Sequence, residues 1–124
     1  MIIPVPEETV VHRIGGASVE NLRLGDLDRS AFPPGISVLL GGSPEEAADR
    51  IRRAFKNSKK WQRLSKRIAS STAGEIFGFG FSVIECATHK LPNHGRIIHP
   101  AGIDGFEDSN LIALSRAFQL TEVD

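Results

Sequence analysis

Four short apolar segments stand out along the chain, and each has the length and the bounding residues of a β-strand. They are TVVHRIGG (residues 9–16), ISVLLGG (36–42), FSVIEC (81–86) and GRIIHP (95–100). The first two end in glycine pairs, which favour the tight turns that follow strands. The pattern therefore predicts a small sheet whose strands are separated by helices and loops.

The segment after residue 42 has the signature of a helix start. Ser43 can cap the helix, Pro44 suits the first helical position, and Glu46 completes a capping box with Ser43. Apolar residues then recur every four positions from Ala47 to Phe55. This spacing predicts an amphipathic helix.

Further helices are predicted downstream. Trp61, Leu64 and Ile68 follow one another at spacings of three and four, which indicates a second helix, and Thr72 with Glu75 repeats the capping signature for a short third one. A closing amphipathic helix over residues 108–120 places three apolar residues on one face: Leu111, Leu114 and Phe118.

Together these elements predict an α+β fold, a small mixed or antiparallel sheet covered by three to four helices, in a single domain over residues 1–124. A chain of 124 residues can bury a core of useful size without disulfides. Apolar positions of the strands and of the closing helix should form one buried cluster: Ile36, Val38, Leu40, Val83, Ile97, Leu111, Leu114 and Phe118.

Composition adds an expected compartment. The single cysteine, Cys86, excludes an internal disulfide and fits a reducing environment. No apolar run is long enough to span a bilayer, and the first residues, MIIPVPEETVV, lack the basic start and cleavage site of a secretory signal. We therefore expect a cytoplasmic protein without a membrane partner.

The net charge of zero conceals a basic run. Residues 52–67 hold eight of the fifteen Lys and Arg residues and no acidic one: Arg52, Arg53, Lys56, Lys59, Lys60, Arg63, Lys66 and Arg67. Such a run is either a solvated helical face or the binding surface for an anionic partner, nucleic acid or an acidic protein.

The segment LPNHGRIIHP (91–100) contains two of the four histidines. Side chains alternate along a strand, so His94 and Arg96 should share one face while His99 lies on the other. A neutral histidine beside an arginine can act as a general base while the cation holds a phosphate, which is what metal-independent phosphodiester cleavage requires. The alternative is that these polar residues only complete a turn and a strand end.

His12 and Arg13 are neighbours on the first strand and must face opposite ways. The apolar company of His12 places it nearer the core, so Arg13 is the better candidate for a solvent-facing pocket. We expect the last strand to pair with the first one, which would bring Arg13 and the 91–100 segment to one cationic pocket. Ser70, Ser71 and Thr72 fit helix capping better than nucleophilic catalysis, and no spacing of His, Cys, Asp or Glu predicts a metal site.

Three patches of the chain, VHR at the end of the first strand, GISVLL in the second and the late segment that ends in IIH, resemble small ADP-ribosyltransferase-like toxins of toxin–antitoxin and secreted effector systems. The resemblance implies that Arg13 grips a dinucleotide, NAD, and that Ser37 supports the nicotinamide pocket. It also implies an acidic antitoxin-like partner. Glu85 is the nearest acidic candidate on a strand.

Two classes of function follow. One is a toxin-like effector that acts on a dinucleotide or, as a nuclease, on RNA, with Arg13, Ser37, His94, Arg96 and His99 as candidate catalytic residues. The other is a non-catalytic interaction module that binds an acidic protein or nucleic acid through residues 52–67.

Overall fold

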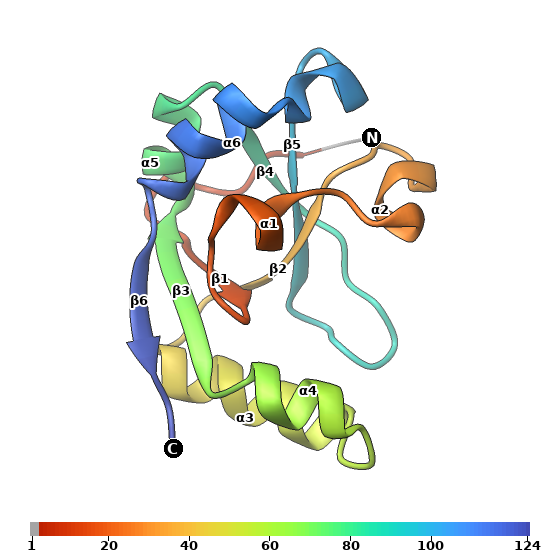
Figure 1. The fold of residues 1–124 in the computed structure, drawn as a ribbon, viewed down its shortest axis with the longest axis vertical. Coiled ribbons are helices and arrows are strands. Elements are labelled where there is room, and N and C mark those ends of the chain that lie inside the picture. Colours follow the sequence, from red (N-terminus) through yellow and green to blue (C-terminus); the bar gives the residue numbers. More distant parts are fainter. Residues whose placement is uncertain (1–2) are drawn as a thin grey trace.

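The computed structural model describes residues 3–124, which form one antiparallel sheet with helices on both faces, an α+β fold (Figure 1). Within this range the sheet has six strands in the order β4-β5-β2-β1-β3-β6. The strands are β1 (Val10–Ile14), β2 (Ile36–Leu40), β3 (Arg67–Thr72), β4 (Ser82–Glu85), β5 (His94–Ile98) and β6 (Gln119–Glu122). The fold class predicted from the sequence is confirmed, in its antiparallel form.

The helices divide between the two faces of the sheet. In chain order they are α1 (Val19–Leu22), α2 (Asp26–Ser30), α3 (Pro44–Ala54), α4 (Lys59–Leu64), α5 (Ala73–Gly78) and α6 (Asp108–Ser115), with a 3₁₀ helix at Gly102–Phe106. In Figure 1, α3 and α4 lie together at one end of the molecule and α5 and α6 at the other. Two separate apolar clusters result.

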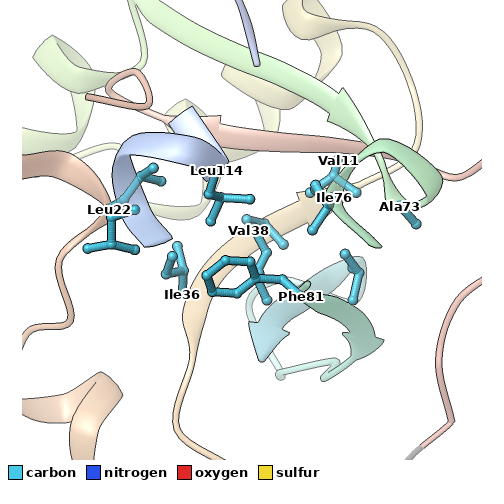
Figure 2. Close-up of a cluster of buried hydrophobic side chains, with 11 residues drawn as sticks. Val11, Leu22, Ile36, Val38, Ala73, Ile76, Phe81 and Leu114 are labelled. Carbon is cyan, nitrogen blue, oxygen red and sulfur yellow. The ribbon is translucent and has the colours of Figure 1, made fainter. Parts of the chain in front are cut away.

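The larger cluster lies beneath α1, α5 and α6 (Figure 2). Six of the eight residues predicted for the core are buried in it: Ile36, Val38, Val83, Ile97, Leu111 and Leu114. Leu40 and Phe118 are partly buried and pack against the same cluster. The predicted core is therefore confirmed as one contiguous group. Phe81, which is fully buried, is its largest side chain.

The smaller cluster fills the space between the sheet and α3. It consists of Ile14, Leu39, Ala47, Ala48, Ile51 and Ile68, with partly buried Phe55, Trp61 and Leu64 packed against it. The capping box at Ser43 and Glu46 forms as predicted and fixes the start of α3. This face of the sheet carries the candidate site.

Two helix boundaries differ from the prediction. The second helix ends at Leu64, and Ile68 lies in β3, which pairs with β1 on one side and β6 on the other. The closing helix ends at Ser115, and Gln119–Glu122 form β6. In both places pairing with strands far away in the sequence decides the conformation, and local periodicity does not report it.

Candidate functional site

A cavity of about 200 Å³ opens between the sheet and the helices α3 and α4. Three of the predicted site residues line it, Arg13 from β1, Ser37 from β2 and His94 from β5. The rest of the lining is apolar: Ile14, Val38, Leu39, Ile51, Phe55, Trp61 and Leu91. A mostly apolar cavity with a few convergent polar groups is the usual form of a small-molecule site.

The helical wall of this cavity, which we call the aromatic cavity, is made by two rings. Phe55 and Trp61 are stacked, with their centroids 5.4 Å apart and an angle of 25° between the ring planes. The Nζ atom of Lys90 lies 5.1 Å from the centre of the Phe55 ring. Lys60 Nζ lies likewise 5.6 Å from the centre of the Trp61 ring, so an aromatic heterocycle would pack against the part of the two rings that lines the cavity.

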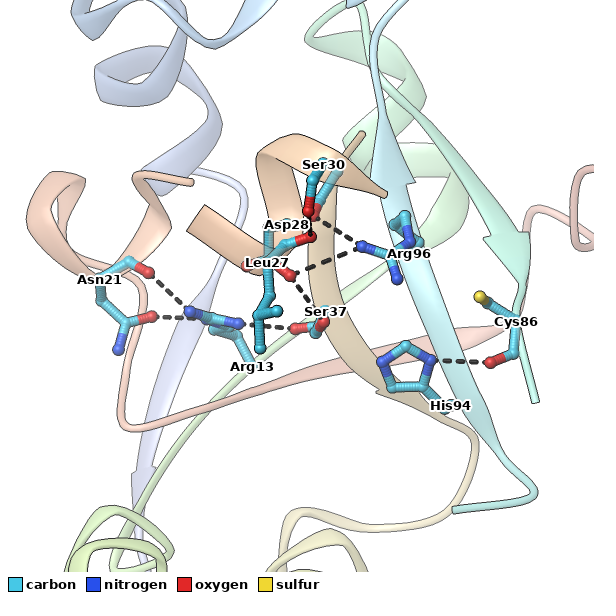
Figure 3. A network of polar contacts seen from close by, with 10 residues as sticks. Arg13, Asn21, Leu27, Asp28, Ser30, Ser37, Cys86, His94 and Arg96 are labelled. Carbon is cyan, nitrogen blue, oxygen red and sulfur yellow. Dashed lines mark hydrogen bonds and ion pairs between the residues drawn. The ribbon is translucent and has the colours of Figure 1, made fainter. Parts of the chain in front are cut away.

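Arg13 is held rigidly at the edge of the cavity (Figure 3). Its Nε donates to Asn21 Oδ1 (2.7 Å), its Nη2 to the Asn21 carbonyl (2.8 Å) and its Nη1 to the Ser37 carbonyl (2.8 Å). The β1–β2 ladder joins only Val11 to Leu40 and His12 to Leu39. The bond from Arg13 Nη1 to the Ser37 carbonyl therefore joins the two strands beyond the end of the ladder. Burial lowers the pKa of Arg13, and the Asp28 carboxylate opposes that shift.

Arg13 differs from the expectation in its exposure. The sequence predicted a solvent-facing side chain, but Arg13 is partly buried and its guanidinium braces α1 and β2. The ligand contact that the resemblance implies for it stays a prediction. Arg13 contributes a fixed positive charge to the cavity wall, since arginine stays ionised in proteins. The sheet order also differs from the expectation, because β5 pairs with β2 and β4 and not with β1.

His94 has the geometry of a neutral base. Its Nδ1 lies 2.8 Å from the Cys86 carbonyl, which can only accept, so Nδ1 carries the proton and Nε2 keeps the lone pair. In Figure 3 the second nitrogen of the ring is on the side of Ser37 and Arg13. Burial lowers the pKa of His94, and the charge of Arg96 adds to this effect against the Cys86 carbonyl and Asp28.

Asp28 joins the site from α2, although no sequence motif marks it. Its Oδ1 accepts from Ser37 Oγ at 3.3 Å and lies 3.5 Å from Arg96 Nη1, which also donates to the Gly35 carbonyl at 3.1 Å. Arg96 thus stands beside the aromatic cavity but is not among its lining residues. The only available signal was the acidic GDLDRS stretch before the second strand.

His99 does not belong to this site. Its ring packs edge-on against Phe81, with centroids 4.9 Å apart, and its Nδ1 accepts from the Ala101 amide at 3.0 Å. The ring thus joins the larger core cluster, on the other face of the sheet, as strand alternation predicted. The structure therefore does not bring His99 together with His94, because the sheet separates them, and its candidate catalytic role stays a prediction.

His12 is fully buried, as its apolar neighbours predicted. Its Nδ1 pairs with Ser70 Oγ at 2.7 Å and its Nε2 with the Gly42 carbonyl at 2.9 Å. Burial lowers its pKa, although the Gly42 and Gly41 backbone opposes the shift. Both ring nitrogens are occupied within the protein, so His12 has a structural role.

The basic run is divided by the fold. Arg52 donates to Ser65 Oγ and to the carbonyls of Val123 and Asp124, Arg53 pairs with Asp49, and Lys60 lies 5.6 Å from the centre of the Trp61 ring. Arg67 is an exposed residue at the start of β3. The other four basic residues line one surface concavity of about 490 Å³ with Asn57, Ser58 and Gln62: Lys56, Lys59, Arg63 and Lys66. We call it the lysine concavity.

A second basic depression, the arginine concavity, also has a volume of about 490 Å³. Arg50 and Arg53 of α3 line it together with Lys90, Leu91 and Asn93 of the loop before β5. Leu91 also lines the aromatic cavity, so the two hollows adjoin. Arg50 and Lys90 lie outside residues 52–67, and only the folded structure brings them to this place.

Comparisons with family models, with curated proteins and with solved structures find no match to this chain. No helix within the described part of the chain combines the length and the apolar character needed to cross a membrane. Among residues 3–124, no group of three or more His, Cys, Asp or Glu side chains is placed to hold a metal ion.

Proposed function

We propose that this domain binds a nucleotide in the aromatic cavity and acts as a toxin-like effector on RNA or on a dinucleotide such as NAD. The observation that carries the proposal is the convergence of Arg13, Ser37 and His94, from three different strands, on a cavity walled by two stacked aromatic rings. An aromatic base suits such a cavity because it can stack while its polar edge meets donors and acceptors.

The size of the cavity limits what can enter. About 200 Å³ is below the usual 300–1,000 Å³ of a small-molecule pocket, so one ring system fits and a whole nucleotide does not. The phosphate of the ligand would then remain outside, where the adjoining arginine concavity supplies Arg50, Arg53 and Lys90. The apolar aromatic cavity thus suits the base of a nucleotide, and the arginine concavity suits its phosphate.

The chemical step that His94 can perform is proton abstraction. In RNA cleavage, a neutral imidazole with its lone pair on Nε2 can take the proton of a ribose 2′-hydroxyl. The 2′-oxygen then bonds to the adjacent phosphorus, the bond from phosphorus to the 5′-oxygen of the next nucleotide breaks, and that oxygen takes a proton from water. Glu85, the acidic candidate for transferase chemistry, is exposed on the edge strand β4 and does not line the cavity. This arrangement favours RNA over a dinucleotide as the substrate.

Nucleotide binding is testable through Trp61, the only tryptophan of the chain. We expect adenosine or guanosine monophosphate to quench its fluorescence, because the base stacks on the aromatic wall, whereas ribose phosphate should not. Phe55→Leu should weaken binding by about 1–3 kcal/mol, or roughly 5- to 150-fold. Phe77→Leu is the matched control, since Phe77 is 64% exposed on α5, across the sheet.

The toxin-like activity is tested by growth of the expressing host. Expression of the wild-type chain should arrest the growth of the host, and His94→Asn should relieve the arrest, because the asparagine amide can still donate to the Cys86 carbonyl but offers no base. If no mononucleotide changes the fluorescence of Trp61 at millimolar concentration, the proposed function is wrong.

A non-catalytic interaction module is the second candidate, and the lysine concavity is the observation that favours it. Four basic residues surround a hollow without a carboxylate among its lining residues, which suits an acidic antitoxin-like protein. Such a module would bind its partner without arresting growth and without a change at Trp61 on addition of a mononucleotide.

A further inference from the structure

We infer that the ligand of the aromatic cavity is one base of a single-stranded RNA, whose phosphates on either side of that base bind in the arginine and lysine concavities. This inference rests on the proposed function and names its substrate class. It is carried by the residues that line the two basic hollows, because some of them are the chain neighbours of Phe55 and Trp61.

The arginine concavity is lined by an arginine that has an unsatisfied donor. Nη1 of Arg50, a residue that lines this hollow, is buried and has no hydrogen-bond partner within residues 3–124, so a phosphate reaches it only if the side chain turns outward. A buried guanidinium nitrogen without an acceptor is unfavourable, and a phosphate oxygen is the acceptor that arginine recognises best. Because Leu91 lines both this hollow and the aromatic cavity, a phosphate bound here would be close to a base bound there.

The lysine concavity begins at the other side of the aromatic wall along the chain. Ala54, just before Phe55, lines the arginine concavity, and Lys56, just after it, lines the lysine concavity. Gln62, which follows Trp61, lines the lysine concavity as well. Lys56, Lys59, Arg63 and Lys66 form no ion pair within the described residues, so their charges are available to a ligand.

Two basic hollows can hold the phosphates of one ligand at two places. A mononucleotide carries its phosphate on one side of the base and can occupy only one of them. An RNA strand carries a phosphate on both sides of each nucleoside, and only an unpaired base can leave its neighbours and stack on protein rings. A duplex would have to expose the base at a cost in stacking and pairing.

The test is the binding of oligonucleotides to the full chain. A ten-nucleotide single-stranded RNA should bind at least about tenfold more tightly than the mononucleotide, because the second phosphate contact is tethered to the first. It should quench Trp61, as the mononucleotide does. The duplex of the same sequence should bind more weakly than the single strand. The affinities for single-stranded DNA and for poly-glutamate are measured for comparison, and both should be lower than the affinity for the RNA.

A double variant isolates the lysine concavity. Lys59→Gln with Arg63→Gln should reduce the slope of log K against log salt for the RNA by about 0.7, the value for the one phosphate contact of this hollow, and leave mononucleotide binding unchanged. Arg29→Gln with Arg116→Gln removes two exposed charges outside both concavities and should change neither. Equal melting temperatures show that both variants are folded.

The outcomes separate the two proposals. If the mononucleotide quenches Trp61 but the RNA binds no more tightly, or the Lys59/Arg63 variant keeps the wild-type salt slope, the RNA assignment is wrong and the nucleotide site stands. If neither ligand reaches Trp61, both proposals fail. Tighter binding of DNA or poly-glutamate than of RNA also overturns the inference.

Discussion

Phe81→Ala should lower the free energy of unfolding by about 3–5 kcal/mol, the largest effect of a single side chain that we expect in this protein. Phe81 is 0% exposed, and its ring meets both His99 and Phe106, with centroids 4.9 Å and 5.6 Å away. Truncation removes these contacts and leaves a cavity that the surrounding strands and helices cannot fill by small shifts. Urea unfolding followed by circular dichroism measures the loss.

Phe77 provides the matched control for this prediction. It belongs to the same FGFGF region of the chain but is mostly exposed. Phe77→Ala should therefore lower the free energy of unfolding by much less than Phe81→Ala does. Similar losses for the two variants would contradict the assignment of Phe81 to the core.

Arg13→Ala should cost about 3 kcal/mol of stability, the second largest effect. The variant leaves the Asn21 side chain, the Asn21 carbonyl and the Ser37 carbonyl without their charged donor. Arg13→Lys should recover only part of the loss, since an ammonium group cannot reach three acceptors with the geometry of a guanidinium. Thermal unfolding of the two variants beside the wild type measures both changes.

Arg29→Ala is the control for Arg13, because it removes an exposed arginine from α2 and should leave the melting temperature nearly unchanged. The result also decides how Arg13 acts. If Arg13→Ala keeps the wild-type melting temperature and loses only nucleotide binding, then the arginine binds the ligand as the resemblance implies, and the bracing role is wrong.

Elements with local signals could be predicted from the sequence. The strand at Ile36–Leu40 is apolar and ends in glycines, and the turn after it requires them, since Gly41 and Gly42 have φ values of 79° and 77°. The capping residues Ser43 and Thr72 mark the starts of α3 and α5 correctly. In each case a bond within a few residues carries the information.

The strands β3 and β6 had no such local signal. Ile68 follows Leu64 at a helical spacing, but its backbone pairs with Ile14 and Thr121, which lie more than fifty residues away in opposite directions along the chain. Leu120 likewise continues the apolar pattern of the closing helix, yet it lies in β6 and pairs with Ala69 of β3. Periodicity alone could not reveal these partners.

The candidate site also depends on strand pairing that local sequence patterns do not reveal. Strand alternation separated His94 and Arg96 from His99 correctly, but it could not state that β2 lies between β1 and β5. The cavity exists because that order places Arg13, Ser37 and His94 on adjacent strands beneath Phe55 and Trp61. Asp28 was missed since it reaches Ser37 and Arg96 from a short helix whose place on the sheet has no sequence signature.

The most direct test of nucleotide binding in the aromatic cavity is a pH titration of the histidine ring resonances by NMR, with and without a mononucleotide. Burial and Arg96 lower the pKa of His94 below the ordinary 6.5, so at pH 7 the free protein should contain the neutral ring with its proton on Nδ1. The nucleotide should shift the His94 resonances, and the nearby phosphate should raise this pKa, while the resonances of His99, on the other face of the sheet, stay unchanged. A His94 ring that titrates like free imidazole and does not respond to the nucleotide would contradict the proposal.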